Sequence, residues 1–135
     1  MPSAVSLIRS PKLSSTAQYA YAATAPAHAR LIFLAGSCPL ELDGSVSGLG
    51  NHAAQAQKCL QNLQIALEAA GANLNDVIST RVLVASTARE DLVSAWNVVR
   101  AAFGDHEVPS TLLGVSVLGY AGQLVEIEAV AAVLD

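Results

Sequence analysis

Two segments of the chain place apolar residues at the spacing of an amphipathic helix. The first begins after Asn51, a residue type that caps helix N-termini, and ends at Gly71, a common C-terminal stop. Most of its polar side chains, Gln55 among them, fall outside the apolar stripe. That stripe consists of Ala56, Leu60, Leu63, Leu67 and Ala70.

The second helix is predicted from Thr87 to Gly104. Its opening, Thr87-Ala-Arg-Glu90, has the form of a capping box, in which the threonine and glutamate side chains each bind a backbone N–H. The glycine is expected to end the helix. Its apolar face consists of Leu92, Trp96, Val99 and Phe103.

Short apolar or alternating runs around these helices predict β-strands. The runs lie at residues 19–24, 30–35, 77–85, 111–118 and 123–133. Turn-like pairs and glycines, at Asp43-Gly44 and at residues 119–122, separate neighbouring segments. The resulting order, β-β-α-β-α-β-β, predicts a single sheet with two helices on one face.

The last strand carries Glu126 and Glu128 in an otherwise apolar run. Because strand side chains alternate between faces, both carboxylates share one face with Leu124, Val130 and Ala132. A carboxylate that is buried and unpaired is costly. The pair is therefore expected at a sheet edge, at a subunit boundary or in a pocket that uses it.

Arg81 is the one cation on its predicted strand, which is otherwise apolar or neutral. In a chain with few charges it needs a carboxylate partner. That partner is either Glu126 or Glu128, in a structural ion pair, or the carboxylate of a substrate. The structural ion pair is the favoured reading.

Composition narrows the class of protein. The 135 residues predict one domain, 1–135, and are 53% hydrophobic but only 13% charged, against about a quarter in an average protein. A surface with so few charges suggests burial between subunits. No apolar run reaches the ~18 residues of a membrane helix, and no signal peptide is evident, so a cytoplasmic protein without membrane contact is expected. The net charge of −4 and scattered cations argue against nucleic-acid binding.

Little in the sequence points to a metal, a cofactor or a disulfide. The three histidines are isolated, and the two cysteines lack C-x-x-C spacing, so no metal site is expected. Gly36-Ser-Cys38 follows a buried strand, where a glycine permits close approach of a ligand to the backbone. Ser37 or Cys38 could then act on a substrate. No neighbouring base or cation in the sequence activates Cys38, however, and a small buried thiol is the favoured reading.

Several of these motifs together resemble the Rid family (reactive intermediate deaminases, also known as YjgF proteins). The resemblance extends from about Tyr19 onward. It rests on Leu34-Ala-Gly36-Ser-Cys-Pro39, on the segment from Gln55 to Gly71, on Asp76-Val-Ile78 and on Val125-Glu-Ile-Glu-Ala129.

The resemblance implies an α+β, chorismate-mutase-like fold: a single mixed sheet with two helices, assembled as a homotrimer with clefts between subunits. Active members add water to an enamine or imine and release ammonia and a 2-keto acid, without a cofactor. Carried over to this chain, the water-handling glutamate is Glu126, the cleft glycine is Gly36, and a cleft tyrosine is Tyr21.

One expected residue is missing. The arginine that clamps the substrate carboxylate in active members is replaced by Thr111, within Pro109-Ser-Thr-Leu112. Two further residues of the family differ in this chain. Ala35 stands in place of a serine that precedes the glycine, and Trp96 stands in place of an asparagine of the second helix. A neutral hydroxyl cannot replace a guanidinium that binds a carboxylate through two hydrogen bonds. The chain therefore resembles a subgroup without the clamp, unless Arg81 replaces it.

Three functions follow as hypotheses. The first is hydrolysis of an imine, an enamine or a related electrophile, in which Glu126 handles water and Thr111 contacts a group other than a carboxylate. Gly36, Ser37, Tyr21, Arg81 and Trp96 are then further candidates for contact with the substrate. The second is a small-ligand-binding or interaction protein without catalysis. The third, an endoribonuclease, is the weakest because the chain is acidic.

Overall fold

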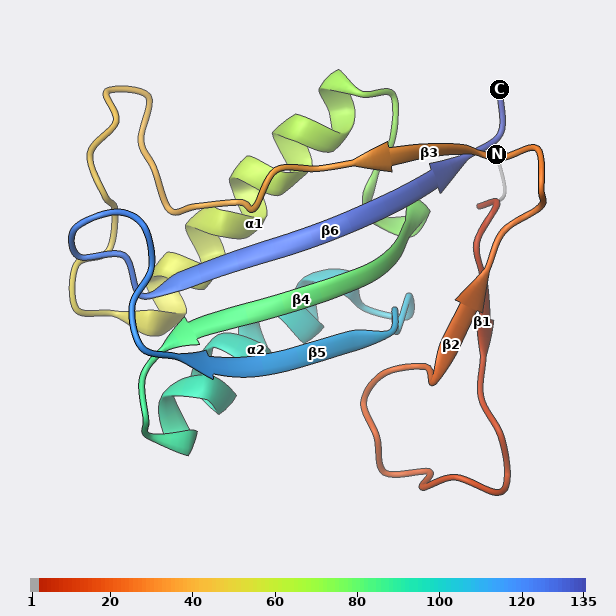
Figure 1. Cartoon of the computed structure of the whole chain (residues 1–135), viewed down its shortest axis with the longest axis horizontal. Helices are drawn as coiled ribbons and strands as arrows, with labels where there is room; N and C mark the ends of the chain where they lie inside the picture. Colours follow the sequence, from red (N-terminus) through yellow and green to blue (C-terminus); the bar gives the residue numbers. More distant parts are fainter. Residues whose placement is uncertain (1–2) are drawn as a thin grey trace.

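The computed structural model describes residues 3–135 as a sheet covered on one face by two helices (Figure 1). The sheet has the strand order β3-β6-β4-β5. Its strands are β3 (Arg30–Phe33), β4 (Val77–Ala85), β5 (Ser110–Val115) and β6 (Val125–Val133). β6 runs antiparallel to both β3 and β4, whereas β4 and β5 are parallel, so the sheet is mixed as predicted.

The N-terminal part differs from the prediction of a single sheet. The weak strand expected at residues 19–24 is β2 (Ala22–Thr24), and it pairs with β1 (Ser6–Ile8), which the sequence pattern did not reveal. These two short strands form a separate sheet beside the end of the main one (Figure 1). Three-residue strands carry too few positions to show alternation.

Both helices form where the pattern predicts them. α1 (His52–Ala69) is capped by Asn51, whose Oδ1 accepts a hydrogen bond of 2.9 Å from the Ala54 N–H. Gly71 follows the helix with a φ of +83°, a conformation that favours glycine. α2 (Arg89–Phe103) ends at Gly104, also as predicted.

The predicted capping box of α2 is wrong. The N-cap residue is Ala88, and no side chain caps the helix from that position. The Ser86 hydroxyl instead accepts a hydrogen bond of 2.9 Å from the Ala88 N–H and donates one of 2.7 Å to Asp91 in the first turn. The hydroxyl that binds a backbone N–H at the start of α2 thus comes from Ser86 and not from Thr87, and the N–H that it binds belongs to the N-cap residue.

The core lies between the helices and one face of the sheet. Its largest fully buried side chains include Leu63 and Leu67 of α1, Val99 of α2, and Val82, Val84 and Ile127 of the sheet. Gln55, which was expected off the apolar stripe, is fully buried among them. A 3-10 helix, η1 (Leu74–Asp76), joins α1 to β4. No helix within residues 3–135 has the length and apolar character needed to cross a bilayer.

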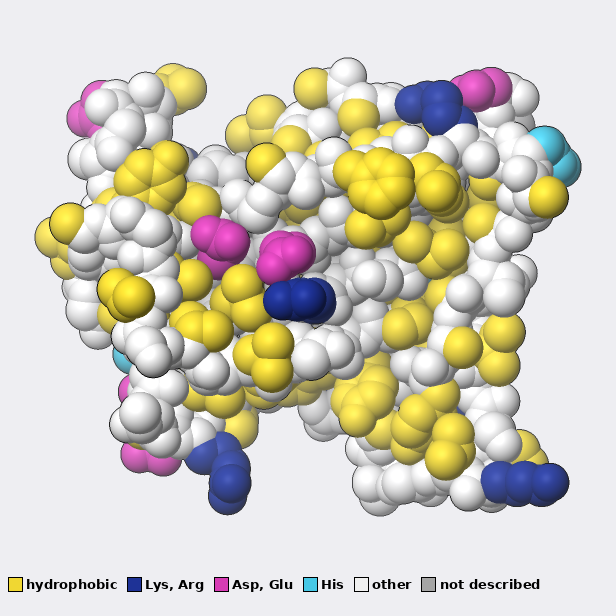
Figure 2. All heavy atoms as spheres, in the orientation of Figure 1, with side chains coloured by type: hydrophobic (Ala, Val, Ile, Leu, Met, Phe, Trp, Pro, Cys, Tyr) yellow, Lys and Arg dark blue, Asp and Glu magenta, His cyan; other side chains and the backbone are white. Residues whose placement is uncertain are grey.

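The opposite face of the sheet, called the open face below, is not covered by either helix (Figure 1). It exposes apolar side chains, with Leu31 52% and Phe33 75% exposed on β3. Figure 2 shows hydrophobic side chains spread over this face around a central group of acidic and basic ones. An apolar surface of this kind typically marks an interface.

Candidate functional site

Glu126 lies on the open face, next to the segment that follows β3. Its strand, β6, is the second of four, so the carboxylates lie in the interior of the sheet, and the first of the three alternatives, a sheet edge, is excluded. The Oε1 atom accepts two hydrogen bonds of 3.2 Å, one from the Cys38 thiol and one from the Gln123 amide.

The other carboxylate oxygen of Glu126, Oε2, packs closely against Gly36. A Cβ built on Gly36 would stand 2.8 Å from the carboxyl carbon of Glu126 and closer still to Oε2. Any side chain at this position would therefore displace the carboxylate. Structure and sequence analysis agree in bringing Gly36 and Glu126 together.

The segment around Ser37 is bound to β6 by its backbone. The Ser37 N–H donates to the Ile127 carbonyl over 2.7 Å, and the Ile127 N–H donates back over 3.0 Å. The Ser37 hydroxyl points to the helix side, where it donates to the Cys59 carbonyl over 2.6 Å. The side chain of Ser37 is thus used inside the core, and only its backbone borders the site.

Two buried glutamines hold the loop before β6. Gln123, 4% exposed, accepts a hydrogen bond from the Tyr120 N–H over 3.1 Å while its amide donates to Glu126. Gln55 of α1 accepts one from the Leu124 N–H over 2.7 Å and donates to the Gly122 carbonyl over 2.9 Å. Sequence reasoning assigned neither residue to the site, because the contacts depend on how the loop folds back.

Cys38 is a hydrogen-bond donor at this site. Burial, followed by the hydrogen bond to Glu126 and the charge of that carboxylate, raises the pKa of the thiol from its ordinary value of 9.0 to about 11. The thiol is therefore protonated at neutral pH and is a poor nucleophile. This agrees with the expectation that Cys38 is not a nucleophile, but the thiol is only partly buried and not, as expected, fully so.

Arg81 pairs with Glu128, as the favoured interpretation predicts. The two residues face each other across β4 and β6, and the guanidinium lies 3.6 Å from the Glu128 carboxylate. Both side chains are about half exposed, so the pair is only a weak source of stability. Thr111 lies beside Arg81 in the register of β4 and β5. Glu126 forms no ion pair with any residue of the described chain.

Tyr21 and Trp96 lie away from Glu126 within one chain. The Tyr21 hydroxyl donates to the Ser14 carbonyl over 2.6 Å, in the N-terminal loop. Trp96 belongs to α2, on the covered side of the sheet, and its indole N–H donates to Gln18 over 2.9 Å. Neither the tyrosine nor the tryptophan therefore takes part in the site around Glu126 within this chain.

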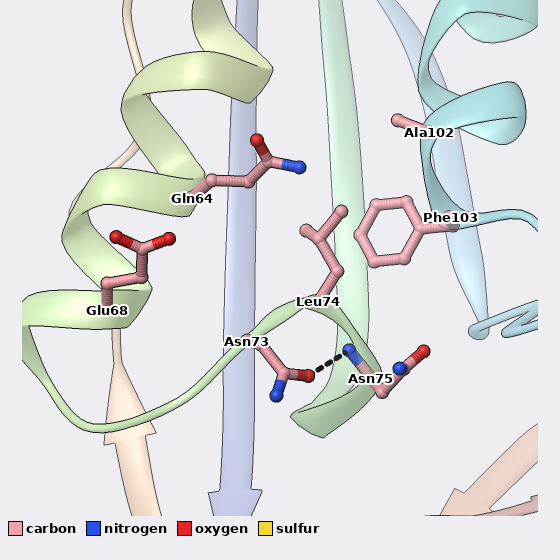
Figure 3. Close-up of a pocket in the computed structure, with 7 residues that line it drawn as sticks. All are labelled: Gln64, Glu68, Asn73, Leu74, Asn75, Ala102 and Phe103. Carbon is pink, nitrogen blue, oxygen red and sulfur yellow. Dashed lines mark hydrogen bonds between the residues drawn. The ribbon is translucent and has the colours of Figure 1, made fainter.

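A hollow of about 380 Å³ lies on the helix side, between α1, η1 and α2 (Figure 3). Its polar lining consists mainly of amides, and the Asn73 side chain is used to accept a hydrogen bond from the Asn75 N–H. The hollow does not reach Glu126. Its lining residues are Gln64, Glu68, Asn73, Leu74, Asn75, Ala102 and Phe103.

This hollow offers no arrangement for catalysis, because its only titratable side chain is Glu68. Across residues 3–135, histidine, cysteine and acidic side chains form no group that could hold a metal ion. The Glu126 environment is therefore the candidate site.

Comparisons with known proteins agree with this architecture. A sequence model of the family described as Endoribonuclease L-PSP matches residues 10–133. YyfB from Yersinia pestis, described as a protein of unknown function of the conserved Rid protein family, is 25% identical with a TM-score of 0.87. That match covers 96% of this chain and 99% of YyfB. A comparison with curated protein sequences gives no match.

Two further solved structures are similar. Rv2704 from Mycobacterium tuberculosis, a member of the YjgF/YER057c/UK114 family, is 32% identical with a TM-score of 0.66, over 96% of this chain and 99% of that one. RidA from the Antarctic bacterium Psychrobacter sp. PAMC 21119 is 22% identical with a TM-score of 0.68, over 95% and 99%. At that identity RidA supports the fold alone.

Proposed function

Since the chain belongs to the Rid family, which the Endoribonuclease L-PSP model describes, we propose that it hydrolyses a small imine, enamine or related reactive metabolite at Glu126. The expected family and α+β fold are confirmed. The observation that carries the proposal is the carboxylate of Glu126, fixed at Oε1 and lying against Gly36 at Oε2.

The carboxylate acts on water in this proposal. Glu126 accepts a proton from the attacking water as the water oxygen bonds to the carbon of the C=N group. The C=N group enters protonated, so this addition gives a neutral carbinolamine, whose nitrogen then receives that proton from Glu126. The C–N bond breaks with its electron pair leaving on ammonia, and the hydroxyl proton passes to Glu126 as the carbonyl forms. Ammonia takes up this proton and leaves as ammonium. Cys38 and Gln123 keep the carboxylate in one orientation through this cycle.

The proposed assembly is a homotrimer whose contacts cover the open face. Phe33 and Leu31 supply apolar area for such contacts, because they stay exposed on a single chain. A cleft between subunits would also allow Tyr21 and Trp96 to contribute from a neighbouring subunit. Arg81 and Thr111 lie on the same face as Glu126 and are proposed to line the cleft.

A non-catalytic ligand-binding protein is the second candidate. The observation in its favour is Thr111, a neutral residue where active relatives are expected to carry the arginine clamp. Hydrolysis of RNA is disfavoured by the carboxylates at the centre of the open face, which repel phosphates (Figure 2).

The test is an assay of ammonia release by the purified protein, with freshly generated small imines that do or do not carry a carboxylate. We expect Glu126→Gln to lower turnover about 100-fold or more, as loss of a general base does. Glu68→Gln, which removes an exposed carboxylate on α1, is the matched control and should retain full activity. Unchanged turnover in Glu126→Gln would refute the proposed role, and binding without any product would favour the second candidate.

A further inference from the structure

We propose that the ligand of the Glu126 site is a small organic cation, a protonated imine or amine that carries no carboxylate group. This inference rests on the proposed function, because it names the ligand class of the same site. It follows from the charges of the open face, the hydrogen bonds already made around Glu126 and the apolar surroundings.

The charges come first. Arg81 and Glu128 neutralise each other at 3.6 Å, which leaves the charge of Glu126 unbalanced by any residue of the described chain. Thr111, next to Arg81, adds no charge. A carboxylate on the ligand would approach this uncompensated carboxylate, whereas a protonated nitrogen would neutralise it.

The hydrogen bonds point the same way. Oε1 of Glu126 already accepts from Cys38 and Gln123, whereas Oε2 accepts from no residue in the described part of the chain. A protonated imine or amine is a donor and therefore matches the free acceptor.

Within residues 3–135, the amides of Asn62 and Gln123 and the guanidinium of Arg81 are already used, which leaves the uncharged Thr111 hydroxyl as a donor on this face. The Asn62 amide donates to the carbonyls of Cys38 and Leu40 over 2.9 Å each, and the Gln123 amide donates to Val125 as well as to Glu126. The guanidinium of Arg81 faces Glu128. A ligand carboxylate would thus find the cation on β4, Arg81, already paired.

The surroundings suit an apolar body. Leu83 lies opposite Glu126 in the register of β4 and β6, and Leu113 lies opposite Leu83 on β5. Leu83 is itself nearly buried, whereas Leu113 is 39% exposed, so a ligand with one positive charge and a hydrocarbon body would neutralise the carboxylate and cover Leu113. In the proposed reaction the protonated C=N group gains water and yields a carbonyl compound and an ammonium ion, so that atoms and charge balance.

A matched pair of stable ligands tests the inference. Propylamine and 2-aminobutyrate share a propyl chain and an ammonium group and differ only in the carboxylate. Their binding to the full-length protein is measured from backbone amide chemical shifts at residues 36–38 and 126. We expect propylamine to bind about tenfold or more tightly than 2-aminobutyrate. Glu126→Gln should abolish propylamine binding, Glu68→Gln should leave it unchanged, and Thr111→Arg should shift the preference toward 2-aminobutyrate.

Equal or tighter binding of 2-aminobutyrate by the unmodified protein would overturn the inference, as would absence of any propylamine-induced shift at these residues. A turnover assay separates this failure from failure of the proposed function. Faster hydrolysis of 2-iminobutyrate than of propan-1-imine would refute the ligand class and uphold the hydrolase. Propylamine binding at Glu126 with neither imine hydrolysed would refute the hydrolase and support the ligand class.

Discussion

Replacing Glu126 by glutamine is expected to make the Cys38 thiol more reactive. The pKa of this thiol is raised from 9.0 to about 11, first by burial and then by the hydrogen bond and the charge of Glu126. Glutamine has nearly the same size, so the effect of burial remains while the negative charge is removed. We therefore expect the pKa of Cys38 to fall by about 1 and to stay above its ordinary value.

The size of the kinetic effect follows from this fall. A pKa that is lower by about 1 gives about ten times more thiolate at any pH well below it. The thiolate is also less nucleophilic at the lower pKa, by about threefold for a Brønsted coefficient of about 0.4–0.5. The net expectation is an alkylation rate about three to four times that of the unmodified protein.

The assay is alkylation by iodoacetamide at one fixed pH, followed by mass spectrometry of peptides that separate the two cysteines. Cys59 is fully buried, and its pKa is also raised, so its labelling reports unfolding and must stay slow in every sample. Glu128→Gln is the matched control, because it neutralises a carboxylate on the same face that does not contact Cys38. Equal Cys38 rates in Glu126→Gln and the unmodified protein would refute the reasoning, and so would an equal increase in Glu128→Gln.

Four further outcomes are expected. Gly36→Ala should displace the site carboxylate, abolish ligand binding and lower the free energy of unfolding by about 1–3 kcal/mol in urea titrations, and unchanged binding would contradict the close packing. Gln123→Leu should lower the free energy of unfolding by about 1–3 kcal/mol, because the hydrogen bonds of the buried Gln123 amide with the Tyr120 N–H and with the Glu126 carboxylate would be lost; unchanged stability in urea titrations would mean that these hydrogen bonds are dispensable. Phe33→Asp should dissociate the proposed trimer in light scattering while circular dichroism stays the same; an intact trimer would exclude Phe33 from the interface. The pKa of Cys38 is higher in the folded protein than in the unfolded chain, so its contribution to stability is present below pH 9.0 and is lost as the pH rises toward about 11. In denaturant titrations over that pH range, Cys38→Ser should therefore lose less stability than the unmodified protein. An equal loss of stability in both proteins would argue against the raised pKa.

Most of the fold could be predicted because its signals are local. The stripe of α1 and the alternation of β6 each repeat over many residues, and both elements form as expected. β1 and β2 are three residues long, and their pairing with each other cannot be read from alternation. The start of α2 shows a second limit, because Ser86 and Thr87 both offer a suitable hydroxyl and only the three-dimensional path selects one.

The site was predictable in part. The alternation of side chains along the last strand placed Glu126 and Glu128 on one face of the sheet. The small number of charged residues predicted that Arg81 pairs with a carboxylate. The strand register then decides that this carboxylate belongs to Glu128. The contact between Cys38 and Glu126 joins positions 88 residues apart and depends on the backbone pairing of Ser37 with Ile127. No local pattern encodes such a contact.

The Gln55 side chain restrains the motion of the site through both its amide oxygen and its amide nitrogen. Both are bound to the loop before β6, at Gly122 and Leu124, so this loop shares the rigidity of α1. Glu126 is therefore preorganised, and ligand binding need not bear the entropic cost of ordering it. We expect the loop between β3 and α1, on the other side of the site, to be the part that adjusts to ligands of different size. Hydrogen exchange should show slow amides at residues 122–126 with or without ligand, and ligand-dependent protection at residues 40–50.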